Sequence, residues 1–140
     1  MFWDSSALVP LLIPEARSSV LTEILGVDRE PVMWWASPVE CQSALHRRRR
    51  EGVIPRSQLD EALSRLDAIV EDYDVVSPSD DLRRRAGRAV AVHPLRAADA
   101  LQLAALIIWG EADPGGERFV CLDERLREAA RQEGFTILPE

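Results

Sequence analysis

FWDSSALV, residues 2–9, decides the fold: a short apolar stretch leads through one acidic residue into a segment with helical character. The same order returns in SPVECQSAL (residues 37–45), LRAADALQLAAL (residues 95–106) and FVCLDERL (residues 119–126). The acidic residues of the four segments are Asp4, Glu40, Asp99 and Asp123. If the apolar runs are parallel strands, their carboxyl ends meet at one edge of one sheet. We therefore expect the four acids to gather at that edge.

Short apolar runs alternate with amphipathic segments along the whole chain. The apolar runs predict strands at residues 2–4, 32–35, 74–77, 119–122 and 136–138. Helices are predicted after a cap at Ser5 or Ser6, then over residues 14–25, 38–50, 55–72, 80–92, 96–109 and 124–133. The sequence DPGG at residues 113–116 predicts an exposed loop. This alternation predicts one domain, residues 1–140, with a three-layer α/β/α fold around a mainly parallel sheet of four or five short strands.

Composition disfavours several classes of function. The formal charge is −7, and all seventeen basic residues are arginines. A Walker A phosphate loop requires a lysine, and receiver domains and most aspartate-nucleophile phosphatases also use one. The acidic total disfavours polyanion binding through the net field, although a local basic patch can override it.

The sequence does not show the usual signals of secreted or membrane proteins. The first residues lack the basic region and small-residue cleavage motif of a signal peptide. Cys41 and Cys121 form no CxxC pair, which favours reduced thiols in a cytoplasm. The longest apolar stretch, Ala100 to Trp109, has about half the length of a membrane span. We expect a cytoplasmic protein without a membrane-crossing segment.

The four acids admit two interpretations. Taken singly, Asp4 and Asp123 can be helix N-caps, Asp99 a first-turn acid favoured by the helix dipole, and Glu40 the capping-box partner of Ser37. Taken together, converging carboxylates repel one another unless positive charge is supplied. Oxygen ligands favour hard cations such as Mg²⁺ or Mn²⁺. We favour the second interpretation, a divalent-metal site.

These segments resemble the successive motifs of the PIN-domain family, most closely the small bacterial ribonuclease toxins of the VapC type. The resemblance rests on DSSALV (residues 4–9), SPVE (37–40) followed by Ala44, Leu45 and Arg47, LRAADALQLA (95–104) and VCLDERL (120–126). It implies a PIN-like fold, Mg²⁺- or Mn²⁺-dependent endonucleolytic cleavage of RNA, a homodimer, and inhibition by a co-produced antitoxin. It also implies that Asp4, Glu40, Asp99 and Asp123 are the metal-binding and catalytic acids.

The resemblance suggests a role for each acid. Asp4 and Asp99 are expected to be direct metal ligands, and Glu40 a ligand or the acceptor of a proton from the attacking water. Asp123 is expected to bind a second ion or to act through water. Cys121 stands where many relatives have threonine or serine, and Pro10 where a lysine is common. Because a thiol is a poor hydrogen-bond donor, support for Asp123 is expected from Ser5 or Ser6.

Arginines are the candidates for contact with RNA. Arg96, one turn before Asp99, is expected to lower the pKa values of the carboxylates. Phosphate contact is assigned to Arg47, Arg48, Arg49 and Arg50, with Arg83 to Arg85 and Arg88 as further candidates. A solvated helix end, or pairing with acidic groups of the antitoxin, explains such runs as well. Trp34 and Trp35 lie in a predicted strand and are expected in the core rather than stacked on bases.

The sequence thus favours a metal-dependent endoribonuclease toxin over two alternatives. One alternative is a catalytically silent PIN-like subunit that binds protein or RNA without cutting it. The other is a 5′-flap type DNA nuclease, which would be expected to carry further acids and DNA-binding elements.

Overall fold

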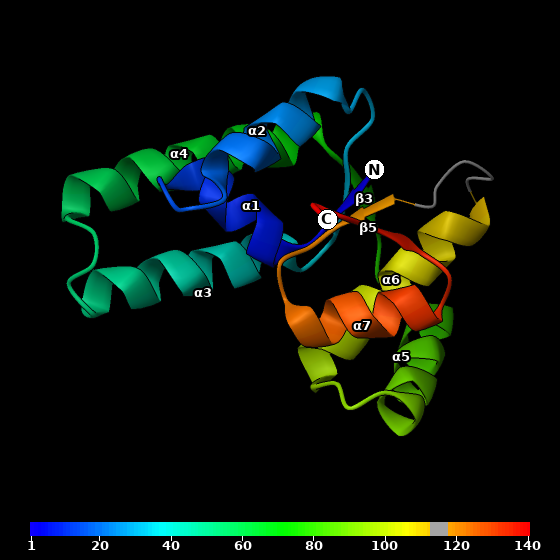
Figure 1. Ribbon diagram of the computed structural model, residues 1–140. Coiled ribbons are helices and arrows are strands. Elements are labelled where there is room, and N and C mark those ends of the chain that lie inside the picture. Colours follow the sequence, from blue (N-terminus) through cyan, green and yellow to red (C-terminus); the bar gives the residue numbers. More distant parts are fainter. Residues whose placement is uncertain (113–117) are drawn as a thin grey trace.

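A parallel β-sheet lies at the centre of the computed structural model, which describes residues 1–112 and 118–140 (Figure 1). The loop predicted at residues 113–116 lies outside the described residues. Within them, five strands pair in the order β3-β2-β1-β4-β5, and every pairing is parallel. The strands are β1 (Phe2–Trp3), β2 (Val32–Trp34), β3 (Asp74–Val76), β4 (Arg118–Val120) and β5 (Thr136–Leu138). The prediction of an α/β fold with four or five parallel strands is confirmed.

Helices cover both faces of the sheet, which gives the predicted three layers (Figure 1). One face carries α1 (Ser5–Leu12), α2 (Ser18–Val27), α3 (Ser37–Arg50) and α4 (Arg56–Asp72). The other carries α5 (Asp80–Val92), α6 (Ala97–Ala112) and α7 (Glu124–Gln132). In the described part of the chain no helix is by itself long and apolar enough to span a membrane; α5 and α6 reach that composition only jointly, across a bend of 119°.

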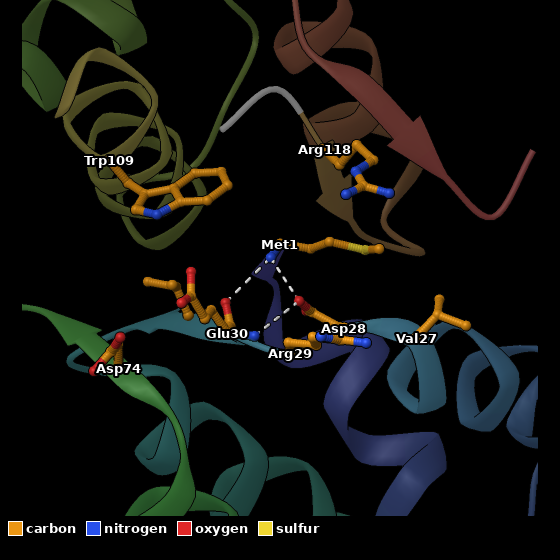
Figure 2. Close-up of a pocket in the computed structure, with 9 residues that line it drawn as sticks. Met1, Val27, Asp28, Arg29, Glu30, Asp74, Trp109 and Arg118 are labelled. Carbon is orange, nitrogen blue, oxygen red and sulfur yellow. Dashed lines mark hydrogen bonds and ion pairs between the residues drawn. The ribbon is translucent and has the colours of Figure 1, made fainter. Parts of the chain in front are cut away.

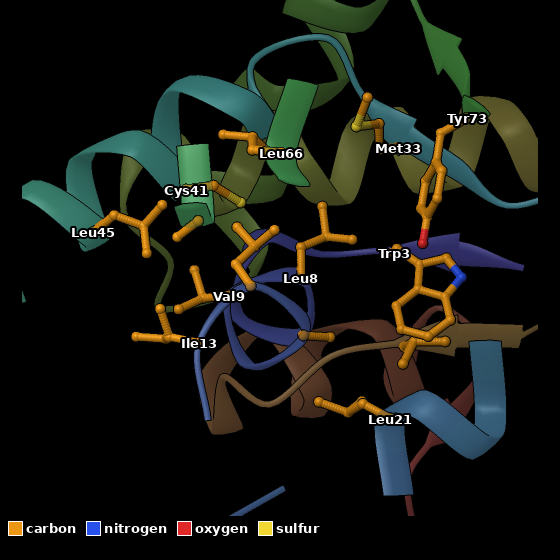
Figure 3. Packing of buried hydrophobic residues seen from close by; sticks show 14 of the residues in the cluster. Trp3, Leu8, Val9, Ile13, Leu21, Met33, Cys41, Leu45, Leu66 and Tyr73 are labelled. Atoms are coloured by element: carbon orange, nitrogen blue, oxygen red, sulfur yellow. The ribbon is translucent and has the colours of Figure 1, made fainter. Parts of the chain in front are cut away.

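Alternation along the strands divides the apolar side chains between two cores. Trp3, Met33 and Val120 pack with the helices α1 to α4, a cluster shown in Figure 3. The neighbouring residues Phe2 and Phe119 pack on the opposite face, against α5, α6 and α7. Both faces of the central strands are therefore buried, as their continuous apolar sequence predicts.

The carboxyl ends of the three middle strands meet at one edge of the sheet. β1 lies between β2 and β4, so the chain leaves β1 toward one neighbour and reaches the other by a later crossover. This is a topological switch point, where α/β folds collect ligands. The helices α1, α3 and α7 begin at this edge, directly after β1, β2 and β4.

The structure decides one helix start that the sequence left open and moves two others. Asp4 rather than Ser5 or Ser6 is the N-cap of α1. α3 begins at Ser37 with Ala36 as N-cap, so Ser37 is not the cap and Glu40 is not its capping-box partner. α2 begins at Ser18 rather than Pro14, because the Ser18 hydroxyl donates to the Pro10 carbonyl and accepts from the Glu15 amide, which keeps the intervening segment as a turn.

Candidate active site

All four predicted acids line one cavity at the carboxyl edge of the sheet. The cavity has a volume of about 220 Å³. Asp4 reaches it from the start of α1, Glu40 from the first turns of α3, Asp99 from α6 and Asp123 from the start of α7. Segments up to 119 residues apart therefore place their carboxylates around the same space. The strand pattern accounts for Asp4, Glu40 and Asp123, whereas Asp99 follows α5 rather than a strand and reaches the cavity from the first turn of α6.

Asp4 is the buried member of the set, with an exposed fraction of 4%. Its Oδ2 accepts hydrogen bonds from the backbone N–H of Ser6 at 2.9 Å, from the Ser6 hydroxyl, and from the Cys121 thiol at 3.5 Å. Burial raises the pKa of Asp4, the Ser6 bonds oppose this rise, and the charge of Asp123 adds to it. The other oxygen, Oδ1, accepts no hydrogen bond from the described residues, so one oxygen remains for a ligand.

Asp99 and Asp123 also use one oxygen each at a helix start. Asp99 Oδ2 accepts from the backbone N–H of Arg96 at 3.2 Å, and Asp123 Oδ1 accepts from the backbone N–H of Leu126 at 2.9 Å. Their second oxygens accept no hydrogen bond from residues that the structure describes. The capping interpretation is therefore correct for Asp4, Asp99 and Asp123. It does not exclude a second role, because each cap uses one oxygen of two.

Glu40 has the environment of a general base. Burial raises its pKa to about 7, the Ser5 hydroxyl bond opposes this rise, and repulsion from Asp4 and Asp99 adds to it. A carboxylate that titrates near neutral pH can take up and release a proton at the working pH of a cell. The effect of Asp4 and Asp99 on Glu40 also shows that the carboxylates share one electrostatic environment.

Ser6 joins the loop after β4 to the start of α1. Its hydroxyl oxygen accepts from the backbone N–H groups of Leu122 at 2.9 Å and Asp123 at 3.2 Å, and it also contacts Asp4. Cys121 Sγ lies 3.7 Å from the same hydroxyl. Ser6 was expected to donate to the Asp123 carboxylate, but it contacts Asp123 only by accepting from its backbone N–H, and its hydroxyl donates to Asp4. The thiol acts on Asp4 instead, and burial raises the Cys121 pKa, so it remains protonated.

The donor set suits a hard divalent cation. The lining carboxylates supply only oxygen, and across residues 1–112 and 118–140 none of them forms an ion pair with an arginine. The uncompensated charge and the free oxygens favour Mg²⁺ or Mn²⁺. Within the same residues no three acidic, cysteine or histidine side chains are already set at coordinating positions. Hydrogen bonds at three helix starts fix one oxygen each of Asp4, Asp99 and Asp123.

Comparison with solved structures identifies the architecture. VapC20 of Mycobacterium tuberculosis, a toxin that cleaves the sarcin-ricin loop, superposes with a TM-score of 0.71 at 17% identity, over 96% of this chain and 95% of that one. A toxin-antitoxin complex from Klebsiella pneumoniae gives a TM-score of 0.63 at 11% identity, over 87% and 85%. The chain has a PIN-like fold. No protein-family model and no curated protein sequence matches it.

A groove continues from the acid cavity of this PIN-like fold along α1 and α3. It has a volume of about 540 Å³ and shares Ser5, Ser6 and Glu40 with the cavity. Arg47 lies on the groove two turns after Glu40, is exposed, and pairs with no acid in the described residues. Arg48 also lines it, but its guanidinium is bound to Glu15, with Nε at 2.9 Å from Oε1.

The positions of the other arginines show which of them could contact RNA bound in the groove. Arg49 and Arg50 are exposed at the end of α3 and do not line the groove. Arg83, Arg84 and Arg85 pair with Asp80 and Asp81 of their own helix, and Arg85 also with Glu111. Arg96 contacts Asp99 through its backbone N–H, and its guanidinium lowers the pKa of neither Asp4 nor Glu40. The expectation that Arg96 lowers the carboxylate pKa values is wrong for these two groups, because its side chain is exposed to solvent.

Near the sheet edge, the prediction for Trp35 is wrong, and Gln102 was not predicted as a site residue. Trp34 is buried as expected, but Trp35 is 59% exposed, because β2 ends at Trp34 and the next residue turns toward solvent. Gln102 lines the acid cavity and is 1% exposed. Its position three residues after Asp99 on α6 places both on one helix face, which was the available indication.

A second cavity, of about 340 Å³, lies at the opposite, amino edge of the sheet (Figure 2). Its carboxylate Asp28 is already paired: Oδ1 accepts from the Met1 amino group at 3.0 Å, and Oδ2 from the Trp3 indole at 2.7 Å. Asp28 therefore ties the start of β1 to the segment before β2. In the acid cavity Asp4, Asp99 and Asp123 each keep one oxygen without a hydrogen bond from the described residues, so this cavity is the better candidate for chemistry.

Proposed function

We propose that this protein is a divalent-metal-dependent endoribonuclease and the toxin of a toxin-antitoxin pair. The observation that carries the proposal is the single cavity lined by Asp4, Glu40, Asp99 and Asp123, with unused carboxylate oxygens and no paired arginine in the described residues. The likeness of fold to VapC20, a toxin that cleaves the sarcin-ricin loop, supports RNA as the substrate.

The carboxylates divide the chemistry between them. Asp4 and Asp99 would hold a cation with the oxygens that their caps leave free, and the more exposed Asp123 would hold a second ion or act through water. Mg²⁺ or Mn²⁺ bound there would activate water and neutralise charge on the scissile phosphate. Glu40, with its pKa near 7, accepts the proton of the attacking water. Arg47 binds a neighbouring phosphate along the groove.

Asp4→Asn tests this mechanism with little structural damage. Asparagine is an N-cap as good as aspartate, so α1 is retained while the charge is removed. The protein is stripped with EDTA, and Mg²⁺ or Mn²⁺ is restored on a panel of structured RNAs. Cleavage is expected only for the metal-restored wild type and for Asp67→Asn, a control at an exposed position of α4. Cleavage that survives chelation, or that persists in Asp4→Asn, would refute the mechanism.

A catalytically silent subunit is the alternative that the three caps favour. Thermal melts separate the two functions, because a ligand that binds only the folded state stabilises it by mass action. Mg²⁺ or Mn²⁺ should raise the Tm of the wild type and leave that of Asp4→Asn unchanged. A wild type without a metal-dependent shift would favour the silent subunit.

The biological partner is a cognate antitoxin that inhibits the protein in the cytoplasm. The form that the antitoxin binds is a homodimer of this chain. The fold likeness to a chain of a toxin-antitoxin complex supports this partner. Co-expression with the product of the adjacent reading frame should yield a stable complex that no longer cuts RNA. Light scattering of the isolated protein should give the mass of two chains; a monomer at micromolar concentration would contradict the dimer.

A further inference from the structure

The Gln102 amide lies in the acid cavity with one end bound and the other end free. The side chain is 1% exposed and follows Asp99 by one turn of α6. Its Oε1 accepts a hydrogen bond from the Ser37 hydroxyl at 3.3 Å, whereas Nε2 has no partner among the described residues. A buried donor left unpaired destabilises the folded state. An unpaired N–H at a ligand cavity indicates that the ligand supplies the acceptor.

Ser37 determines which end of the amide faces the cavity. In the opposite orientation Nε2 would donate to Ser37, and Oε1 would be the end of the amide left for the cavity. The cavity is lined by carboxylates, which also only accept hydrogen bonds, so Oε1 would find no donor there. Ser37 is fully buried, so its hydroxyl is not competed for by bulk solvent. The carbonyl oxygen therefore belongs on Ser37, which leaves the buried Nε2 as the end of the amide that a ligand of the cavity could engage.

The missing acceptor has the chemistry of a phosphate. None of the lining carboxylates lies within hydrogen-bond distance of Nε2, because the helix caps hold Asp4, Asp99 and Asp123 elsewhere. A phosphodiester brings two anionic non-bridging oxygens, which are strong acceptors. We propose that Gln102, oriented by Ser37, donates a hydrogen bond from Nε2 to one non-bridging oxygen of the scissile phosphate. This substrate contact rests on the proposed ribonuclease function and is separate from the role of the carboxylates.

The variant Gln102→Met removes the donor at nearly constant side-chain length. It should keep the Mg²⁺-dependent rise in Tm, because the four carboxylates are untouched. Loss of a hydrogen bond to a charged group should lower kcat/KM for RNA by about tenfold or more. Gln132→Met is the matched control, because Gln132 is exposed on α7 and outside the cavity; it should behave as the wild type.

Sulfur substitution of the RNA locates the contact. In each of two substrates, one non-bridging oxygen of the scissile phosphate is replaced by sulfur, a poor acceptor. For one isomer the sulfur should slow the wild type markedly more than it slows Gln102→Met, because the variant has already lost the bond. For the other isomer the two proteins should respond alike. Ser37→Ala, which frees the amide to rotate, should reduce the isomer difference and keeps the test available if Gln102→Met folds poorly.

Three results would overturn the assignment. The first is a kcat/KM of Gln102→Met equal to that of the wild type. The second is an equal effect of sulfur on wild type and variant for both isomers. The third is loss of the Mg²⁺-dependent Tm shift in Gln102→Met, which would mean that the amide binds the cation and not the phosphate. A wild type that neither gains stability from Mg²⁺ nor cuts RNA is a distinct outcome, since it refutes the proposed function itself.

Discussion

The Ser6 hydroxyl oxygen lies 3.2 Å from the backbone nitrogen of Asp123 and accepts its hydrogen. Ser6, in the first turn of α1, thus holds Asp123 at the start of α7, although 117 positions separate the two residues. The same hydroxyl donates to Asp4. One side chain therefore sets the spacing between a buried carboxylate and an exposed one.

Ser6→Ala is expected to lower the free energy of unfolding by about 1–3 kcal/mol, because two backbone N–H groups and one carboxylate oxygen lose their partner. It should also reduce the Mg²⁺-dependent rise in Tm, since the loop that carries Asp123 is released. Urea unfolding with and without Mg²⁺ measures both effects. Ser19→Ala, at an exposed position of α2, should change neither; equal losses in the two variants would contradict the role of Ser6.

Glu40 should make the metal-free protein less stable as the pH rises toward neutrality. Its folded pKa of about 7 lies above the ordinary value of 4.5, so the folded state holds the proton more tightly than the unfolded state. This contribution to stability is complete below pH 4.5 and is lost as the pH rises through 7. Thermal melts in EDTA should show this decline in the wild type and in Glu23→Gln, whose site is exposed, but less of it in Glu40→Gln. Parallel pH profiles for all three would argue against a raised pKa.

Arg47 and Arg50 should differ in RNA binding, although both belong to one arginine run. Arg47 lines the groove beside Glu40, whereas Arg50 does not. Arg47→Ala should weaken binding and reduce the slope of log affinity against log salt by about one, the signature of a lost phosphate contact. Arg50→Ala should leave the slope unchanged. Fluorescence anisotropy with a labelled RNA over a salt series measures both, and identical slopes would remove Arg47 from the interface.

Arg127 should be a stability residue rather than a binding residue. Its buried guanidinium donates to the Cys121 carbonyl at 2.7 Å and to the Pro139 carbonyl at 2.8 Å, which joins the loop before α7 to the end of the chain. Arg127→Met should cost about 2–3 kcal/mol, because both buried carbonyls lose a charged donor. Arg125→Met, at an exposed position of the same helix, is the control. A loss below about 0.5 kcal/mol in Arg127→Met, the size typical of surface substitutions, would contradict this role.

Local pattern predicts the sheet and the placement of the acids. Asp4, Glu40 and Asp123 could be assigned to one edge because each follows a strand, and parallel strands bring such positions together. Asp99 was assigned to the same edge by the same pattern, although it follows α5 and not a strand. Helix starts were less accurate. Sequence left the cap of α1 open between Asp4 and the two serines after it, and it placed the cap of α3 at Ser37 rather than Ala36, because tertiary contacts decide between neighbouring positions.

Contacts between distant positions could not be predicted from one sequence. The pairing of Arg48 with Glu15 spans 33 positions, and the bond from Ser37 to Gln102 spans 65. Neither leaves a local pattern. Trp35 was placed in the core because alternation gives no indication of where a short strand ends. The separation of Arg47 from its three neighbours likewise depended on the shape of the groove.

β1 consists of two residues whose rings point to opposite sides of the sheet, Phe2 toward α6 and Trp3 toward α2 and α4. Inserting one residue between Trp3 and Asp4 would carry the Trp3 indole into the hydrophobic interior that holds the smaller Phe2 ring. If β1 kept its register instead, the first turn of α1, and with it the Asp4 carboxylate, would be displaced from its partners. The two rings of β1 therefore fix the number of residues that precede the first carboxylate of the cavity.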